Sequence, residues 1–347
     1  MTLRWLLIAL PASWLLAMLH ASPLLVFGIT ALGVVPLAAA MGASTETLAH
    51  RTGPAAGGLL MATFGNAAEL ILAIAALRAG LTNLVKASIT GSILGNLLLI
   101  LGLALVAGGL RKPTLTFNRT AAGMGGAMLL LAVTGLVVPA LFAVAHPAAA
   151  PAVSSHLSEA VALVLGATYA ASLVFSLRTH RNVFQGTAAP TGHETAIPVG
   201  RAIAVLAVAT VLVAVQSEIL VHATEQVVAR FGVSEVFLGL IVIPLIGNAA
   251  ENAGAVVVAR KGDTDLALSI ALGSSTQVAL FVAPLLVFAG VVLGQPMTLV
   301  FTPLEVLALG LAALIVTVIA LDGESHWFEG AQLLAAYAIF AVAAWFI

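Results

Sequence analysis

The chain contains no cysteine and few charged residues. Of its 347 residues, 8% are Asp, Glu, Lys or Arg, 6% are aromatic, and the formal net charge is −1. The absence of cysteine excludes disulfide bonds and thiolate metal sites, and the near-zero net charge gives no sign of a nucleic-acid partner. Because soluble domains carry about 25% charged residues, this chain has too few polar side chains to cover a water-facing body.

Apolar residues make up 61% of the chain, in runs that repeatedly reach the ~20 residues needed to cross a bilayer. These runs predict an all-α polytopic membrane protein that is embedded in the lipid bilayer. The polar stretch 179–198 is the only sizeable loop. Eleven transmembrane helices are predicted near 4–20, 23–49, 55–78, 83–109, 120–145, 157–178, 199–230, 235–260, 265–293, 302–321 and 328–347.

The first span has some features of a cleaved signal peptide, namely Arg4, an apolar run and Ala21-Ser22. Pro11 in its middle and the next apolar span directly behind it favour a retained leading helix. The basic residues then predict the orientation. When the N-terminus and every second loop are placed on one side, ten of the 13 Lys and Arg residues fall there. Cytoplasmic loops are rich in Lys and Arg, so the N-terminus is predicted to be cytoplasmic and the C-terminus outside.

One short motif occurs twice. The sequence Gly-Asn-Ala-Ala-Glu stands at Gly65–Glu69 and again at Gly247–Glu251, an offset of 247 − 65 = 182. At the same offset Gly91-Ser92 matches Gly273-Ser274. A weaker similarity, at the different offset of 216 − 44 = 172, links Ser44–Glu46 to Gln216–Glu218. We therefore divide the chain into a leading helix (1–22), a first five-helix repeat (23–178), a cytoplasmic loop (179–198) and a second five-helix repeat (199–347).

An odd number of spans in each half reverses the direction of the second half. The halves are therefore predicted to be inverted-topology repeats, an architecture that many secondary transporters use for alternating access around a midplane site. The glutamates that end the two motifs, Glu69 and Glu251, lie in otherwise apolar runs. A carboxylate in hydrocarbon is costly and is usually functional. A glutamate ends both copies of the motif, and this repetition argues against a purely structural hydrogen bond as the reason for it.

The neighbours of each glutamate suit a hard cation. Asn66 and Gly65 precede Glu69 by three and four residues, on the same helical face, and Asn248 and Gly247 repeat this arrangement for Glu251. Asparagine offers a carbonyl oxygen, and glycine allows close approach of backbone. Oxygen ligands of this kind are those that Ca²⁺ prefers.

Pro244 removes an amide donor and leaves the carbonyl of Leu240 without its helical partner. Two carboxylates balance one Ca²⁺. When the ion leaves, two bare carboxylates repel each other in a low-dielectric site, so protons take its place. This competition is the simplest form of antiport. It needs no resident cofactor, since Ca²⁺ and H⁺ are the transported ions.

Several polar residues are candidates for a supporting role. Ser92 and Asn96 lie one turn apart, as do Ser274 and Gln277, and helix–helix packing explains these pairs equally well. Glu46 and Glu218 are candidates for gates or proton paths, unless one of them faces a loop. Ala62 is a further candidate. The other acids near span ends, Glu225, Glu305, Asp322, Glu324 and Glu329, are predicted to be solvated.

These motifs resemble the calcium/cation–proton antiporter family of the cation/Ca²⁺ exchanger superfamily. The resemblance implies Ca²⁺/H⁺ exchange, with Glu69 and Glu251 as the ion-binding acids on spans three and eight. The compact chain is similar to the prokaryotic form, which implies a plasma (inner) membrane. The family usually has Asn in place of Met61 and His in place of Asn252. The segments that carry the resemblance are Gly57–Leu70, Gly91–Leu98, Ile243–Glu251, Asp265–Ala267 and Gly273–Gln277.

Other functions are left open by the residues. An antiporter for another cation, such as Na⁺/Ca²⁺, Mn²⁺/H⁺ or K⁺/H⁺, would use the same oxygen ligands. A passive cation channel would need no inverted repeat. An intramembrane enzyme is disfavoured because no H-E-x-x-H or G-x-S-x-G motif is present. The sequence leaves open whether the protein forms a homo-oligomer.

Overall fold

The computed structural model describes residues 2–52, 54–148, 150–180 and 198–346. It consists of two compact units, one formed by residues 1–88, 192–251 and 347, and the other by residues 89–191 and 252–346. Each unit draws on both of the predicted repeats. The chain passes from one unit to the other within the helices that begin at Thr82 and Ala249.

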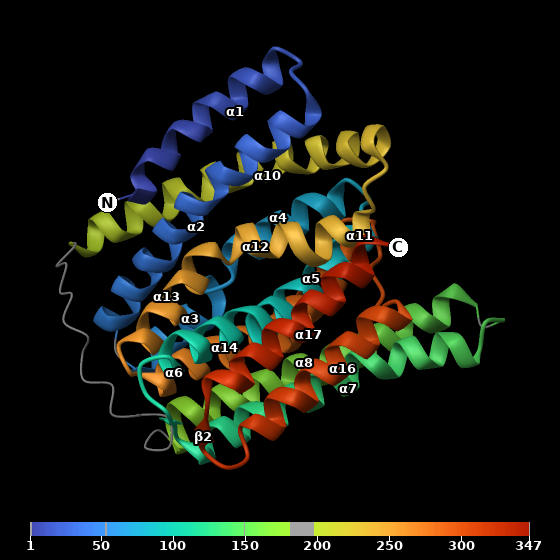
Figure 1. Ribbon diagram of the computed structural model, residues 1–347. Helices are drawn as coiled ribbons and strands as arrows, with labels where there is room; N and C mark the ends of the chain where they lie inside the picture. The colour runs from blue at the N-terminus through green and yellow to red at the C-terminus, as the bar shows by residue number, and fades with distance from the viewer. Residues whose placement is uncertain (1, 53, 149, 181–197, 347) are drawn as a thin grey trace. The chain divides into compact units, whose positions relative to one another are not determined.

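Unit 1 is built around two long helices, α2 (Pro23–Thr52) and α10 (Val199–Phe231), which lie side by side (Figure 1). At 1.5 Å per residue they are about 45 and 50 Å long, which exceeds the ~30 Å hydrocarbon core of a bilayer. α10 ends at Gly232, whose φ of +65° favours glycine. The other elements are the 3₁₀ helix η1 (Thr2–Ile8), α1 (Ala9–Met18), α3 (Pro54–Phe64), α4 (Ala67–Arg78), α11 (Glu235–Phe237), the π-helix η4 (Leu238–Val242) and α12 (Ile243–Gly247).

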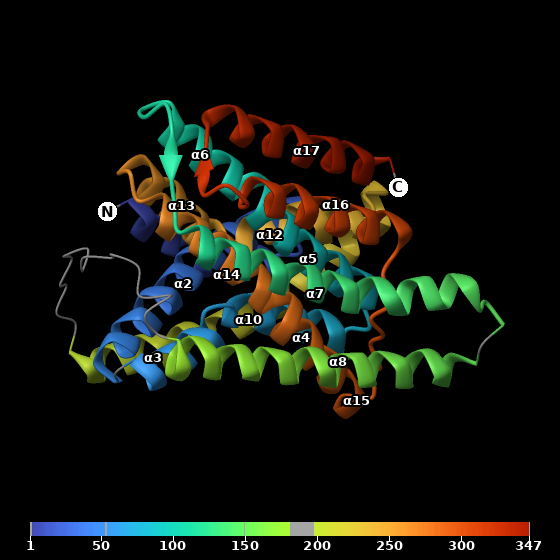
Figure 2. The same cartoon turned by 90° about the horizontal axis from the view of Figure 1, so that it is seen from below.

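Unit 2 begins within α5 (Thr82–Leu94). Figure 2 shows α7 and α8 side by side, and α17 packs along α6. Its further helices are the π-helix η2 (Gly95–Ile100), α6 (Leu101–Gly109), α7 (Arg119–Ala145), α8 (Pro151–Val174), the π-helix η3 (Phe175–Thr179), α13 (Ala249–Arg260), α14 (Thr264–Gln277), the π-helix η5 (Val278–Val282), α15 (Ala283–Val292), α16 (Pro303–Ile319) and α17 (Trp327–Trp345).

A small sheet in unit 2 adds to the predicted all-α fold. Strand β1 (Leu115–Thr116) pairs antiparallel with β2 (Glu324–Ser325), with Leu115 opposite Ser325. The backbone amide of Phe117 also donates a hydrogen bond to Gly323 O at 3.0 Å. No sequence pattern predicts this pairing, because two-residue strands are too short for an alternating pattern.

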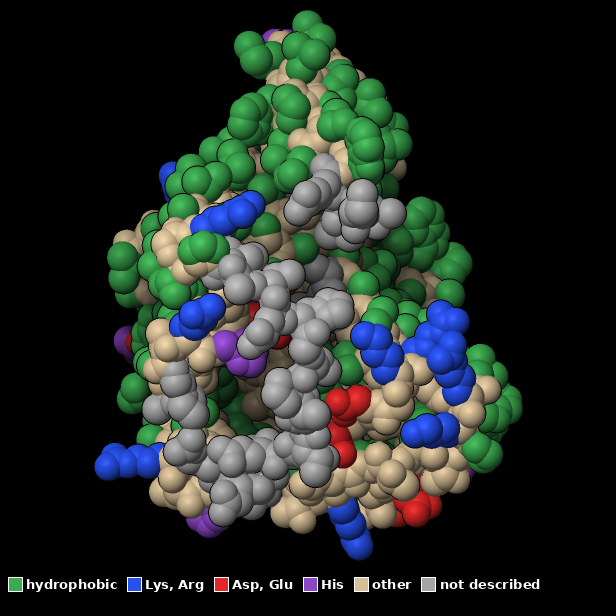
Figure 3. Space-filling view, turned by 90° about the vertical axis from the view of Figure 1, so that its left-hand side faces the viewer, with side chains coloured by type: hydrophobic (Ala, Val, Ile, Leu, Met, Phe, Trp, Pro, Cys, Tyr) green, Lys and Arg blue, Asp and Glu red, His purple; other side chains and the backbone are tan. Residues whose placement is uncertain are grey.

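Seven helices among the described residues are long and apolar enough to cross a membrane. Three shorter apolar helices lie at Trp5–Met18, Glu235–Gly247 and Pro303–Ile319, so the full count of eleven spans stays a prediction. Large apolar side chains cover much of the upper part of the face in Figure 3. The seven long helices lie at Pro23–Thr52, Thr82–Gly109, Arg119–Ala145, Pro151–Thr179, Val199–Phe231, Thr264–Val292 and Trp327–Trp345.

Some predicted boundaries need correction. The spans predicted at 55–78 and 235–260 are each interrupted, the first at Gly65–Asn66 and the second at Asn248. The first span begins as a 3₁₀ helix and ends at Met18, and the sixth begins at Pro151, where proline occupies the first turn. The predicted loop 179–198 lies almost entirely outside the described residues.

Candidate ion-binding site

Both copies of the repeated motif place their Gly-Asn pair at a helix break. Asn66 stands between α3 and α4 with φ −104° and ψ 29°, and Asn248 stands between α12 and α13 with φ −92° and ψ 4°. These angles lie outside the helical region. In both copies the glutamate is then the third residue of the following helix. Identical sequences thus give matching local structures, and each break exposes helix-end backbone groups that an ion can use.

A small cavity lies beside Glu69. The volume in which the centre of a water-sized sphere can lie is about 10 Å³. This is about the space that one water molecule needs. Of the described residues that line it, Glu69 is the only charged one, so its carboxylate is the natural ligand for a cation there. The lining residues are Ala38 and Met41 of α2, Phe64, Gly65, Ala68 and Glu69 of the first motif region, and Gly247 of the second motif.

The two motifs meet at this cavity. A β-carbon built on Gly247 would lie 3.4 Å from Glu69 Cγ and 4.0 Å from Glu69 Oε1. Residues 178 positions apart in the sequence (247 − 69 = 178) therefore lie next to each other. Asn66 and Asn248 are both buried, each with 2% of its surface exposed. The structure thus places Gly65, Glu69 and Gly247 around one cavity, and their role in binding an ion stays a prediction.

The backbone of Glu251 lies in the first turn of α13, as Glu69 lies in the first turn of α4. Its side chain, like that of Ala62 in α3, lies outside the described part of the structure. Pro244 is buried near the start of α12, directly after the π-helix η4 that contains Leu240. The helix is interrupted only at Asn248, four residues after this proline.

Four of the predicted supporting residues, Ser92, Asn96, Ser274 and Gln277, lie in unit 2. Asn96 Nδ2 donates a hydrogen bond to Ser274 Oγ at 2.9 Å, which links η2 to α14. Ser92 and Asn96 are buried, while Ser274 and Gln277 are half-buried. The π-helices η2 and η5 begin at Gly95 and Val278, next to these polar residues. Single π-turns are frequent at functional sites. The hydrogen bond also serves helix packing, so a ligand role for these residues stays a prediction.

Glu46 and Glu218 do not line the Glu69 cavity. Glu46 Oε1 lies 3.8 Å from His50 Nε2 one turn later in α2, and both side chains are largely exposed. Glu218 Oε1 accepts a hydrogen bond from Arg78 Nη1 at 3.1 Å, which links α10 to the end of α4. Their roles as gates or proton paths stay a prediction.

The prediction of a solvated Glu305 is wrong. Glu305 is only 2% exposed and sits in the first turn of α16. Its Oε2 accepts hydrogen bonds from the Thr302 backbone amide and hydroxyl, both at 2.8 Å, and its Oε1 accepts one from the buried Thr90 hydroxyl at 3.4 Å. The bonds to Thr302 were readable in the sequence, because Thr-x-x-Glu before an apolar run is the pattern of a capping box, but the burial of Glu305 was not.

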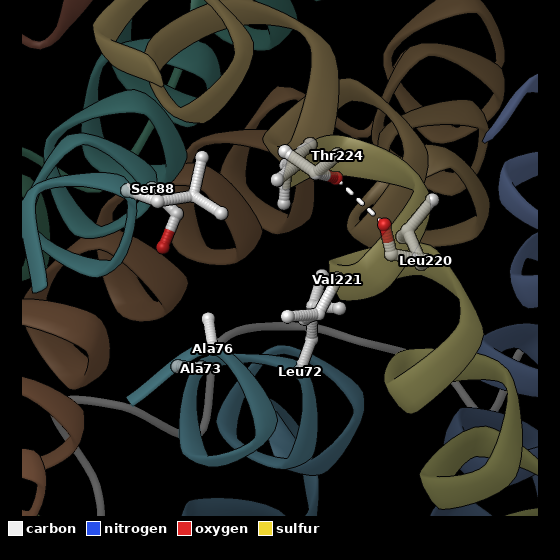
Figure 4. A pocket seen from close by; sticks show the side chains of 9 residues that line it. Leu72, Ala73, Ala76, Ser88, Leu220, Val221 and Thr224 are labelled. Carbon is white, nitrogen blue, oxygen red and sulfur yellow. Dashed lines mark hydrogen bonds between the residues drawn. The ribbon is translucent and has the colours of Figure 1, made fainter. Parts of the chain in front are cut away.

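A second cavity of unit 1 lies farther along α4 (Figure 4). Among the described residues that line it, the hydroxyl groups are those of Ser88, which donates to Val85 O, and Thr224, which donates to Leu220 O. No charged side chain is among its described lining residues, which suits it poorly for an ion. The lining consists of Leu72, Ala73, Ala76, Leu84, Ser88, Leu220, Val221, Thr224 and Ile243.

Long apolar helices, paired helix breaks and a carboxylate in a small cavity define a helical membrane transport protein. The family model described as sodium/calcium exchanger protein matches residues 22–178 and 201–346. The chain therefore belongs to the sodium/calcium exchanger family and is an integral membrane protein.

Known relatives cover nearly the whole chain. A Ca²⁺/H⁺ antiporter of Synechocystis is 45% identical over 337 residues, covering 92% of this chain and 91% of that protein. The Ca²⁺/H⁺ antiporter ChaA of Bacillus subtilis is 42% identical, with 96% and 95% covered. The crystal structure of the Ca²⁺/H⁺ antiporter protein YfkE superposes with a TM-score of 0.85 at 38% identity, covering 99% of this chain and 98% of that one.

Proposed function

We propose that the protein is a secondary active transporter that exchanges Ca²⁺ for H⁺ across the membrane by alternating access. One observation carries this proposal: Glu69 of the first motif and Gly247 of the second line the same small cavity. A site shared by two related halves is the arrangement that alternating access needs.

The ligands suit Ca²⁺ and its replacement by protons. Glu69 and Glu251 supply two negative charges that balance one Ca²⁺. Asn66, Asn248 and the backbone carbonyls at the two helix breaks supply neutral oxygens, and Ca²⁺ takes six to eight oxygen ligands. When the ion leaves, protonation removes the cost of two unbalanced carboxylates in an apolar interior. Ca²⁺ and H⁺ therefore compete for the same groups, and this competition couples their movements.

The relatives favour protons over Na⁺ as the exchanged ion. The proteins with 41–45% identity from Synechocystis, Aphanothece halophytica and Bacillus subtilis are named Ca²⁺/H⁺ antiporters. The sodium–calcium exchanger NCX_Mj, at 15–16% identity, shares the fold alone. An exchanger for a different cation remains the alternative, and the transport assay below distinguishes the two.

The architecture that we propose is a leading helix followed by two inverted five-helix repeats at 23–178 and 199–347. The family matches at 22–178 and 201–346 fall on these two halves, which supports the division. The basic residues support a cytoplasmic N-terminus. The bacterial relatives support a location in the plasma membrane.

The test is uptake of radioactive Ca²⁺ into everted membrane vesicles under an imposed proton gradient. We expect uptake that an uncoupler abolishes and that vesicles with Glu69→Gln protein lack. Uptake that persists with the uncoupler would instead indicate a passive channel. Gradient-driven uptake of Mn²⁺ or K⁺ without Ca²⁺ would replace the proposed substrate.

A further inference from the structure

The side chain of Gln216, in the middle of α10, is fully buried. Its Oε1 accepts a hydrogen bond from Trp14 Nε1 of the leading helix α1 at 3.0 Å. The Ser13 hydroxyl of α1 lies 3.1 Å from the same oxygen and shares its single hydrogen between this oxygen and Leu10 O at 2.8 Å. Hydrogen bonds between helices act as a polar link in apolar surroundings. One side-chain amide thereby joins α1 to α10.

Helix α2 completes this contact at Gly33. A β-carbon at position 33 would lie 2.5 Å from Gln216 Nε2 and 3.2 Å from Leu10 Cδ2. Only glycine leaves room for the amide between the three helices. Within the described part of the chain, Gln216 Nε2 has no hydrogen-bond partner. A leucine here would avoid the cost of that buried donor, so packing alone does not account for a glutamine.

Leu10 extends the contact from the leading helix to the ion site. It lies one turn before Trp14 and shares a buried cluster with Met41 of α2 and Ala68 of α4. Met41 and Ala68 are also lining residues of the Glu69 cavity. The leading helix and the wall of the cavity thus belong to one buried hydrophobic cluster.

We propose that Gln216 is a positioning residue for ion exchange. It holds α1, α2 and α10 together, and this fixes the α2 wall of the cavity relative to the Glu69 carboxylate. The leading helix, which has no counterpart in either predicted repeat, is then part of the transport machinery and not only a membrane anchor. The inference rests on the proposed role of Glu69 as an ion-binding carboxylate.

Two substitutions break this link from opposite sides. Gln216→Leu removes the acceptor, and Trp14→Phe removes one donor while keeping an aromatic ring. Trp5→Phe is the matched control, because Trp5 is 75% exposed in η1. We expect the KM for Ca²⁺ in vesicle uptake to rise about threefold to tenfold in Gln216→Leu. The rise should be smaller in Trp14→Phe and absent in Trp5→Phe.

An unchanged KM in both variants, with only a lower unfolding temperature, would show a purely structural link and overturn the proposal. If Gln216→Leu does not fold, Trp14→Phe is judged by the same criterion. These readouts separate positioning from stability, since a loss of folded protein lowers the maximal uptake rate without changing the KM.

A second readout does not need transport. The rate at which dicyclohexylcarbodiimide modifies Glu69 in the purified protein reports access to its carboxylate, and peptide mass spectrometry measures it. We expect this rate to differ at least about threefold between Gln216→Leu and the wild type. If the wild type takes up no Ca²⁺ but the rate still changes, the proposed function fails while the link stands. Normal uptake with an unchanged KM and an unchanged rate would refute the link alone.

Discussion

The Cα of Gly247 faces the Glu69 side chain so closely that a β-carbon there would lie 3.4 Å from Glu69 Cγ. The backbone of the second motif thus forms one wall beside the carboxylate of the first. A methyl group at position 247 would take up space in a cavity that has room for about one water-sized body.

Gly247→Ala tests whether that space is used by the ion. A contact of 3.4 Å is an ordinary van der Waals distance, so we expect the variant to fold. Its methyl group should lower Ca²⁺ uptake by about tenfold or more, as one added methyl does in a tightly fitted site. Gly166→Ala in α8 is the control, since no atom lies within 4 Å of a β-carbon there. Equal uptake in both variants would show that the ion does not pass this point.

Glu69→Gln and Glu251→Gln test the paired charges. Each change removes a negative charge at nearly constant shape, so we expect Ca²⁺ uptake to fall by about a hundredfold or more. The folded variants should be as stable as the wild type or more stable, because a neutral amide is less costly to bury than a carboxylate. Glu159→Gln in α8, where the carboxylate only faces His156 at 3.5 Å, should keep full uptake. Wild-type uptake in either motif variant would remove that glutamate from the site.

The hydrogen bond between Asn96 and Ser274 can be measured by a double-mutant cycle. Asn96→Ala, Ser274→Ala and the double variant should show a coupling of about 0.6 kcal/mol in the free energy of unfolding, the average for such bonds in membrane proteins. A cycle that is additive within error would show that the bond does not stabilise the fold. A raised KM for Ca²⁺ in the single variants would add a ligand role.

The absence of cysteine makes the orientation easy to test. Thr114→Cys and Ala148→Cys place single thiols at exposed positions on either side of α7. With a cytoplasmic N-terminus, a membrane-impermeant maleimide should label position 114 in everted vesicles and position 148 in right-side-out vesicles. The reverse pattern would invert the predicted topology. Labelling of both positions from one side would show that α7 does not cross the membrane.

Most of the helices could be predicted from the sequence, because a run of about 20 apolar residues is a local property. The breaks at Asn66 and Asn248 were harder to predict, since the residues around them are as apolar as those of a continuous helix. Glu305 shows the opposite case. Its capping pattern with Thr302 is local and readable, but its hydrogen bond from Thr90 joins residues 215 positions apart.

The class of protein and the choice of Glu69 and Glu251 as candidates followed from the residues alone, because the cost of an isolated charge in an apolar run does not depend on the rest of the fold. Which residues meet could be read only from the folded chain. The contact of Gly247 with Glu69 and the bonds from Ser13 and Trp14 to Gln216 join residues about 180 to 200 positions apart. Such contacts follow from how helices pack against each other, and neither local propensity nor motif spacing encodes that packing.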